Sequence, residues 1–181
     1  AGPRLAWQIR DAGFGYGSPA VAGNVLYLIS NEGVENEYAL ALNARDGARL
    51  WSTPLGKVGN PDQQPSYPGA RSTPTVAGDL LYCLGSDGDL ACLERASGKL
   101  RWKKNLRAEF GGKPGVWAYS ESPLVDGERV IVSPGGAEAT MVALNRTSGA
   151  LVWKSAIPGG DTAGYASPVV MEVGGVRQYV Q

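Results

Sequence analysis

The residue types that most often perform chemistry in enzymes are scarce in this sequence. It contains no histidine, so it cannot supply an imidazole base, a Ser-His-Asp triad or a histidine-ligated metal. Its two cysteines are too few for a zinc site built from thiolates. The carboxylates outside turns, such as Glu109, Glu121 and Asp161, show no paired spacing typical of general acid–base catalysis. The sequence therefore assigns no catalytic or metal-ligating residue, and no cofactor site is evident.

The residues best suited to binding lie in or beside long linkers, which span residues 52–71, 103–120 and 154–165. Long loops on a rigid scaffold commonly carry binding sites. We therefore expect a shallow ligand or partner site lined by Tyr16, Arg71, Trp117, Tyr119, Glu121 and Tyr165. The alternative is that these side chains plug a central channel and satisfy one another's hydrogen bonds.

The two cysteines lie on opposite arms of an expected hairpin centred on Asp87-Gly88. Asp-Gly is a favoured pair for a two-residue turn. Counting outward from that turn places Cys83 opposite Cys92 in a non-hydrogen-bonded pair, with Cα atoms about 4.5 Å apart. A cross-strand disulfide is therefore expected in an oxidising compartment. The equal alternative is a pair of reduced, buried thiols.

An internal repeat organises the chain. Trp51, Trp102 and Trp153 are evenly spaced, 51 residues apart. Leu42, Leu93 and Leu144 keep the same spacing, and so do Gly47, Gly98 and Gly149. Each copy consists of a short apolar run, a polar turn that ends in glycine, and a second run that ends in tryptophan. This pattern predicts a β-hairpin, in which the glycine provides a positive φ.

A second repeated unit precedes each hairpin. A Ser-Pro or Ser-Thr-Pro segment and a Gly-containing turn lead into an apolar run, as in residues 18–29, 72–84 and 121–132. No stretch of 11 or more residues has a helical period. Each period of about 50 residues thus holds four short antiparallel strands, and the chain is predicted to be all-β. The expected units are a preceding last strand in residues 1–10, including Leu5-Ala6-Trp7, then residues 11–59, 60–110, 111–160 and 161–181.

Four antiparallel strands per repeat form the blade of a β-propeller. The pattern Leu-x-Ala-Leu-Asn-x-x-Ser/Asp-Gly-x-x-x-Trp resembles the tryptophan-docking repeat of the pyrroloquinoline quinone (PQQ)-like propellers. That superfamily includes quinoprotein alcohol dehydrogenases and an outer-membrane assembly lipoprotein. The resemblance covers nearly the whole chain and implies about three and a half blades of a seven- or eight-bladed ring. It also implies that Trp51, Trp102 and Trp153 are structural, each docking on a neighbouring blade.

The favoured function is a binding or assembly scaffold that acts through its long-loop face. The resemblance supplies an alternative, a PQQ-dependent dehydrogenase of alcohols or sugars. Such enzymes hold PQQ between a tryptophan and a disulfide of adjacent cysteines, bind calcium, and use an aspartate base. The sequence has no adjacent cysteines, so catalytic residues would lie outside this chain. A sensor domain attached to a kinase or a membrane anchor is a third class.

The charge balance narrows the range of partners. Lys plus Arg and Asp plus Glu are both 17, so the formal net charge is zero. A nucleic-acid or membrane-surface binder needs a basic field, and no apolar run approaches the length of a membrane span. We expect a protein or small-molecule ligand on the loop face. The missing blades are expected from the rest of a longer chain or from another copy. The resemblance and the cysteine pair together imply a periplasmic or secreted location.

Overall fold

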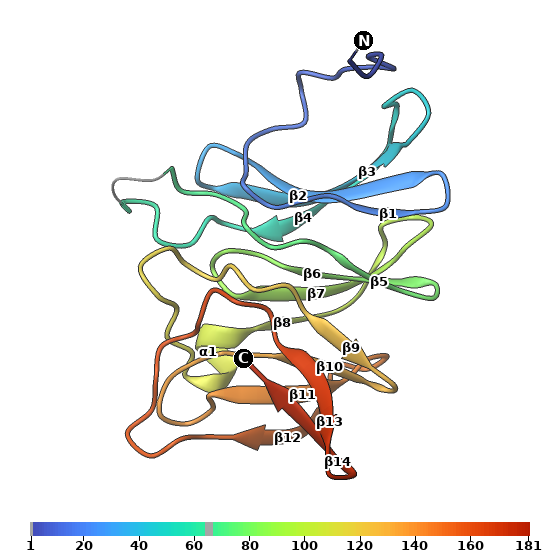
Figure 1. Cartoon of the computed structure of the whole chain (residues 1–181). Coiled ribbons are helices and arrows are strands. Elements are labelled where there is room, and N and C mark those ends of the chain that lie inside the picture. Colours follow the sequence, from blue (N-terminus) through green and yellow to red (C-terminus); the bar gives the residue numbers. More distant parts are fainter. Residues whose placement is uncertain (1, 64–66) are drawn as a thin grey trace.

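The computed structural model describes residues 2–63 and 67–181. Residues 64–66, which fall within the first long linker, lie outside the described residues. In the described ranges the strands form three four-stranded antiparallel sheets and one two-stranded sheet, which follow one another along the molecule (Figure 1). The all-β prediction and the four-stranded blade are confirmed.

Each four-stranded sheet uses consecutive strands in chain order. The first contains β1 (Ala20–Ala22), β2 (Val25–Glu32), β3 (Asn36–Asn43) and β4 (Arg49–Gly56). The second contains β5 (Thr75–Ala77), β6 (Leu80–Leu84), β7 (Asp89–Glu94) and β8 (Leu100–Asn105). The third contains β9 (Leu124–Asp126), β10 (Arg129–Val132), β11 (Met141–Asn145) and β12 (Leu151–Ser155). Strands β13 (Val169–Val173) and β14 (Val176–Val180) form the last sheet.

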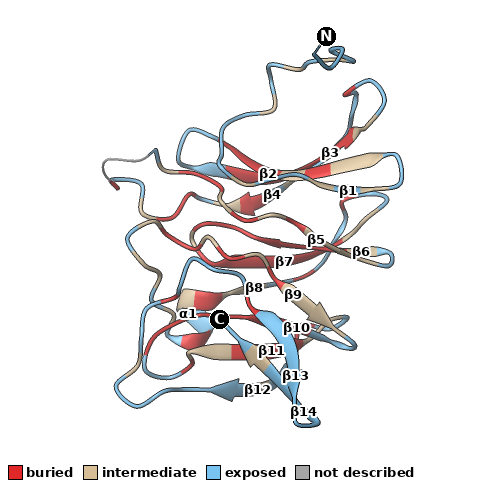
Figure 2. Cartoon of the chain, in the orientation of Figure 1, coloured by how far each residue is buried: buried red, intermediate tan, exposed pale blue. Residues whose placement is uncertain are grey.

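The hydrophobic core lies between successive sheets. Short apolar residues on the middle strands are fully buried, and they form one cluster between the first and second sheets and another between the second and third. The first strands of these sheets, β1, β5 and β9, contact one another in turn and so mark the inner side of the arc. Burial is greatest in β6 and β7 and falls to almost nothing in β13 and β14 (Figure 2).

The repeated tryptophans join neighbouring sheets. The ring of Trp51 lies against Gly98, and its Nε1 donates a hydrogen bond to the Arg95 carbonyl at 3.2 Å. Trp102 lies against Gly149 in the same way and donates to the Arg146 carbonyl at 2.9 Å. Each of these contacts therefore joins the last strand of one sheet to the hairpin turn of the next. Trp153 instead packs on Tyr179 of β14, with ring centroids 5.7 Å apart.

The expected strand at Leu5–Trp7 is wrong, because the described residues 2–9 form no strand. Trp7 nevertheless lies against Gly47, and its Nε1 donates a hydrogen bond to the Ala44 carbonyl at 3.0 Å. Trp51 and Trp102 make the equivalent contacts with the next two hairpins. A strand needs a hydrogen-bonded neighbour, and the described chain places no strand beside residues 5–7. The tryptophan contact depends only on the next hairpin and therefore forms without the strand.

The expected disulfide is also wrong, because both cysteines are free and buried. In the hairpin of β6 and β7, Cys83 pairs with Ala91 and Cys92 pairs with Tyr82. The loop is one residue longer than expected: Gly88 donates to the Gly85 carbonyl and adopts a φ of +94°. This is a type I turn followed by a glycine bulge rather than a two-residue turn. A register shift of one residue moves a side chain to the other face, so the two thiols point into different cores.

One short helix, α1 (Leu106–Phe110), follows β8. The side chain of Asn105 accepts a hydrogen bond from the Ala108 backbone N–H, and Gly111 ends the helix with a φ of 64°. The sequence carried this capping signal, but the helix is too short for a helical period to show. No helix among residues 2–63 and 67–181 is long and apolar enough to cross a membrane.

Candidate functional site

Three of the predicted site residues meet at the loop end of the sheets. The guanidinium of Arg71 lies 4.6 Å from the centre of the Tyr16 ring and 5.9 Å from that of Trp117. Each residue comes from the loop before the first strand of a different sheet. Arginine over aromatic faces is an attractive arrangement, worth about 0.5–1 kcal/mol at exposed sites. The repeat therefore brings together residues that are about 50 positions apart in the chain.

Tyr165 extends this group to the fourth sheet. Its hydroxyl accepts a hydrogen bond from the Trp117 backbone N–H at 3.3 Å, and the ring remains 45% exposed. We call Tyr16, Arg71, Trp117 and Tyr165 the aromatic row. It runs across three successive junctions between sheets, which no single loop could span.

Tyr119 and Glu121 do not belong to the aromatic row, contrary to expectation. Tyr119 is fully buried, and its hydroxyl donates to the Pro134 carbonyl at 2.8 Å. Glu121 is fully buried as well, accepting hydrogen bonds from the Ser133 N–H at 2.6 Å and from Gln181 Nε2 at 2.8 Å. Their positions before a strand resembled those of the exposed residues, but sequence position alone does not show on which side of the loop a side chain lies.

Sequence reasoning missed an exposed aromatic pair beside the row. Phe14 and Tyr67 stack with ring centroids 6.2 Å apart and an interplanar angle of 27°. They are 64% and 65% exposed, which is unusual for a pair of large apolar rings. Two cavities of about 340 and 400 Å³ adjoin the pair, and both are lined by Phe14, Tyr67 and Pro68. The signal was the alternation of glycine and aromatic residues in Gly13-Phe14-Gly15-Tyr16-Gly17.

The loops that carry these rings are held by hydrogen bonds. Phe14 and Asn31 exchange two backbone hydrogen bonds of 2.9 Å, which attach the Phe14 segment to the end of β2. The Tyr16 N–H donates to the Ala70 carbonyl at 2.7 Å, and the Tyr67 N–H donates to the Tyr16 hydroxyl at 3.1 Å. The rings are therefore positioned before any ligand arrives.

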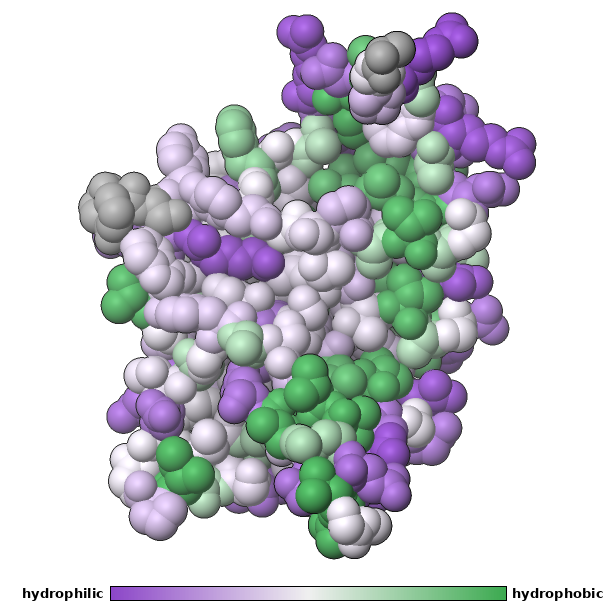
Figure 3. Space-filling view, viewed as in Figure 1, coloured by the Kyte–Doolittle hydropathy of each residue, from purple (hydrophilic) through white to green (hydrophobic). Residues whose placement is uncertain are grey.

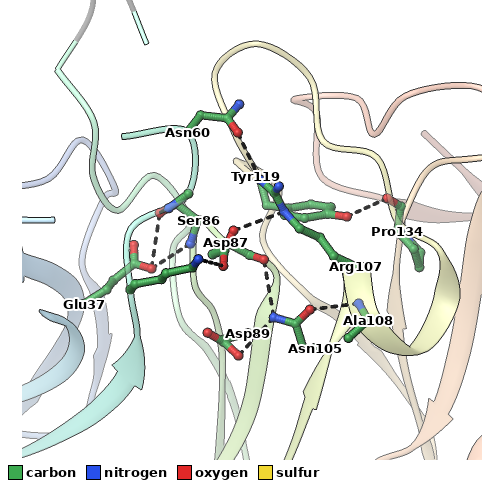
Figure 4. Close-up of polar contacts among 12 residues, drawn as sticks. Glu37, Asn60, Ser86, Asp87, Asp89, Asn105, Arg107, Ala108, Tyr119 and Pro134 are labelled. Carbon is green, nitrogen blue, oxygen red and sulfur yellow. Dashed lines mark hydrogen bonds and ion pairs between the residues drawn. The ribbon is translucent and has the colours of Figure 1, made fainter. Parts of the chain in front are cut away.

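A polar cluster lies at the next junction, around the tip of the β6–β7 hairpin (Figure 4). Asp87 forms an ion pair with Arg107, whose Nε lies 3.1 Å from Asp87 Oδ1, and Lys57 Nζ lies 3.8 Å from Asp87 Oδ2. Arg107 also donates to Asn60 Oδ1 at 3.0 Å. Asn60 in turn donates to the carbonyls of Gly115 and Val116, the residues that lead into Trp117. This cluster therefore joins the loop of the aromatic row to the β6–β7 hairpin and to α1.

Buried Glu37 bridges the first and second sheets beside this cluster (Figure 4). Its Oε2 accepts hydrogen bonds from the Ser86 N–H at 2.7 Å and the Ser86 hydroxyl at 3.3 Å, while Oε1 is buried without a partner. Burial raises the pKa of Glu37 to about 8 and that of Glu121 to about 7. A perturbed carboxyl can mark a catalytic site, but both side chains are fully buried, so neither can touch a ligand.

The chemistry available at the aromatic row is recognition. Planar rings and one guanidinium can stack on a ligand or anchor a protein partner. Across the described ranges, no three acidic or cysteine side chains gather into a set that could hold a metal ion. The geometry of the row therefore supports binding.

A comparison with known families agrees with this architecture. The family model described as outer membrane protein assembly factor BamB matches residues 35–181. The chain belongs to this family. A curated BamB from Alkalilimnicola ehrlichii is 25% identical over 140 residues, which cover 77% of this chain and 32% of that protein. The serine/threonine-protein kinase AfsK of Streptomyces griseus is 29% identical over 137 residues, covering 76% of this chain and 15% of the kinase. This BamB-family chain thus spans about a third of the length of the BamB relative and about a seventh of the length of the kinase.

Solved structures support the same fold. A europium-containing methanol dehydrogenase superposes with a TM-score of 0.62 at 22% identity, covering 84% of this chain and 27% of the enzyme. At that identity the likeness shows the fold alone. The BamB-family chain is therefore a PQQ-like β-propeller protein, as its repeat predicted.

Proposed function

We propose that this chain is the binding part of a BamB-like propeller and that the aromatic row contacts a protein partner. The observation that carries the proposal is Arg71 placed over both Tyr16 and Trp117. Tyrosine, tryptophan and arginine are the residue types most enriched at the energetic centres of protein interfaces. The name of the BamB relative favours a component of outer-membrane protein assembly as the partner, and we propose a periplasmic location together with that partner.

Site-specific crosslinking tests this function. A photoreactive amino acid at position 117, in the full-length protein in its own cells, is expected to crosslink one envelope protein, identified by mass spectrometry. Arg71→Ala is expected to remove most of that crosslink, because it takes away the cation between the rings. Leu151→Ala, at a site 49% exposed on β12, is the matched control and is expected to leave the crosslink unchanged. Equal crosslinking in all three proteins would contradict the proposal.

The kinase relative favours a second candidate, a sensor domain in a longer signalling protein. The match to AfsK covers 76% of this chain at 29% identity, so a segment of similar sequence occurs in that kinase. In this case the aromatic row would take a ligand or a regulatory partner. The crosslinked partner distinguishes the two functions, because an outer-membrane assembly component would support the first and a kinase domain or its substrate the second.

A PQQ-dependent dehydrogenase remains the enzymatic alternative only for a longer chain. The described residues present neither a carboxylate set for calcium nor adjacent cysteines. Calorimetric titration of PQQ with calcium into the full-length protein tests this alternative. No binding is the outcome that fits a scaffold, and micromolar binding with a shifted quinone spectrum would restore the enzyme.

A further inference from the structure

The turn that carries Trp117 is held by a side chain from a distant linker. The turn closes where the Ala118 N–H donates to the Gly115 carbonyl at 3.0 Å. Asn60 lies in the linker that follows β4, and its Nδ2 donates to the Gly115 and Val116 carbonyls, both at 3.0 Å. One carboxamide therefore holds two successive carbonyls of this turn.

Arg107 of α1 fixes the orientation of the Asn60 carboxamide (Figure 4). Arg107 Nη2 donates to Asn60 Oδ1 at 3.0 Å, and Arg107 Nε lies 3.1 Å from Asp87 Oδ1. A guanidinium has donors only, so the amide oxygen faces Arg107 and the NH2 group faces the Trp117 turn. Both donors of Asn60 are therefore used to hold that turn.

The backbone is in a left-handed conformation on both sides of this contact. Asn60 has a φ of 47° and Ala118 a φ of 64°, and across residues 2–63 and 67–181 these are the two non-glycine residues with a positive φ. Asparagine tolerates this conformation better than most residues, whereas alanine does not. Strained backbone persists where the surrounding structure fixes it, and it is concentrated at binding sites and clamps. The strain therefore supports a functional role for the contact between Asn60 and the turn.

Ala118 separates an inward side chain from an outward one. Tyr119 is fully buried, so packing in the core holds that side of the turn. Trp117 is only partly buried, and its ring lies 5.9 Å from the guanidinium of Arg71. The position of Trp117 therefore depends on the hydrogen bonds that Asn60 gives to its turn.

We propose that Asn60 is a positioning residue of the aromatic row, whose carboxamide holds Trp117 in the place where the partner binds. A loop that is already fixed in its bound conformation loses less entropy when the complex forms. The affinity of the row then depends on a residue that contributes no ring or charge to it. This inference rests on the proposed function and adds a residue on which binding at the same site depends.

Two substitutions separate the carboxamide of Asn60 from its backbone conformation. Asn60→Gly removes the carboxamide, and glycine adopts a positive φ freely. Asn60→Asp tolerates the same φ and keeps an acceptor for Arg107, but it loses both donors to the turn. Asn43→Asp is the matched control, because Asn43 lies in the β3–β4 hairpin turn, at the other end of β4. Asn43 Oδ1 accepts from the Arg45 N–H at 3.0 Å, and aspartate keeps that acceptor.

Photocrosslinking of the full-length protein in its own cells gives the first readout. The photoreactive amino acid is placed at position 16, so that residue 117 stays a tryptophan. Asn60→Gly and Asn60→Asp are each expected to lower the crosslink yield about threefold or more, and Asn43→Asp is expected to leave it unchanged.

Hydrogen exchange of the purified full-length protein, without partner, gives the second readout. The amides of Trp117 and Ala118 are expected to exchange about tenfold faster in both Asn60 variants than in the wild type. The amides of β6 and β7 are expected to keep their wild-type rates, which also shows that the variants are folded.

The two readouts together decide the inference. A wild-type crosslink yield in either Asn60 variant would overturn it, as would an equal loss of yield in Asn43→Asp. A lower yield with unchanged exchange at Trp117 and Ala118 would also overturn it, because Asn60 would then contact the partner itself. If the wild-type protein crosslinks nothing from position 16 or position 117, the proposed function fails and this inference fails with it. If the wild type crosslinks and the Asn60 variants do so equally, only this inference is lost.

Discussion

The glycines that close the repeated turns are required for two reasons, a positive φ and the close approach of a tryptophan ring. Gly47, Gly98 and Gly149 have φ values of 75°, 70° and 71°, a region that residues with a side chain rarely adopt. Each also lies under the tryptophan of the preceding repeat. A Cβ at Gly98 would lie 2.6 Å from the ring of Trp51, closer than carbon atoms normally approach. The glycine and tryptophan of the repeat are therefore one structural unit.

This contact predicts the effect of Gly98→Ala. The substitution is expected to destabilise the protein more than Gly78→Ala, because Gly78 has a similar φ of 62° but no atom within 4 Å of an added Cβ. Gly78→Ala reports the backbone strain alone, about 1–2 kcal/mol. Gly98→Ala adds overpacking against Trp51, about 1–3 kcal/mol more. Urea unfolding measures both values, and equal losses of stability in the two variants would show that the ring moves aside without cost.

Buried Glu37 makes stability depend on pH. Its pKa is raised from 4.5 to about 8 by burial, and the carboxylates of Asp89 and Asp87 raise it further, against hydrogen bonds from Ser86. Between about pH 4.5 and pH 8 the Glu37 carboxyl therefore keeps its proton in the folded state, whereas the unfolded state has already released it. The free energy of unfolding is expected to fall as pH rises through this window, by at most about 1.4 kcal/mol per pH unit for one group.

Glu37→Gln is expected to flatten this pH dependence, because the amide does not ionise. The flattening should be clearest between about pH 7 and pH 8, since the pKa of Glu121, about 7, lies below that range. Glu35→Gln, an exposed site on the same hairpin, is the control and should keep the wild-type slope. Urea unfolding at a series of pH values gives the comparison. An unchanged slope in Glu37→Gln would mean that Glu37 is ionised in the fold.

At the scale of single elements, turn length decides which side chains meet. The three-residue loop of the β6–β7 hairpin places Cys83 in the core shared with the first sheet and Cys92 in the core shared with the third. Burial raises the pKa of both thiols, that of Cys92 to about 11. The thiolate is the reactive form, so both cysteines should be inert in the folded protein.

A thiol assay checks this arrangement. The folded protein is expected to react slowly or not at all with a thiol reagent at neutral pH, and the unfolded protein to show two thiols even after mild oxidation. Cys83→Ala should reduce the number to one. Finding no thiol after unfolding would establish the disulfide and with it a different hairpin register.

The repeat predicted the strands well because it records alternation, turns and spacing, which are local properties. It predicted less where a residue depends on its neighbours in space. Leu5–Trp7 has strand residues, but the residues that the structure describes place no strand beside it. Tyr119 and Tyr165 both precede a Ser-Pro segment, yet one is buried and the other exposed. Phe14 was missed because its exposure comes from pairing with Asn31 across the loop, which no local pattern reveals.

At the scale of the whole molecule, stability is unevenly distributed along the arc. The sheet of β5–β8 is covered on both faces by neighbouring sheets, whereas β13 and β14 are exposed over most of their length (Figure 2). The side chains of Val169, Met171 and Val173 of β13 are exposed, and the space-filling view shows hydrophobic surface on this part of the molecule (Figure 3). In repeat proteins each unit is stabilised mainly by its neighbours, so local unfolding should begin at β13 and β14.

Hydrogen exchange of the 181-residue chain tests this gradient. The amides of β6 and β7 are expected to exchange about a hundredfold or more slowly than those of β13 and β14. Arg177 anchors the last sheet by an ion pair with Asp126 of β9, and the Tyr179 hydroxyl donates to the same carboxylate at 2.7 Å. Arg177→Ala should therefore speed exchange in β13 and β14 and leave β6 and β7 unchanged. Arg129→Ala, which removes a nearby exposed arginine, is the control. Equal protection across all four sheets would mean that the arc unfolds as one cooperative unit, with coupling between sheets stronger than their separate burial indicates.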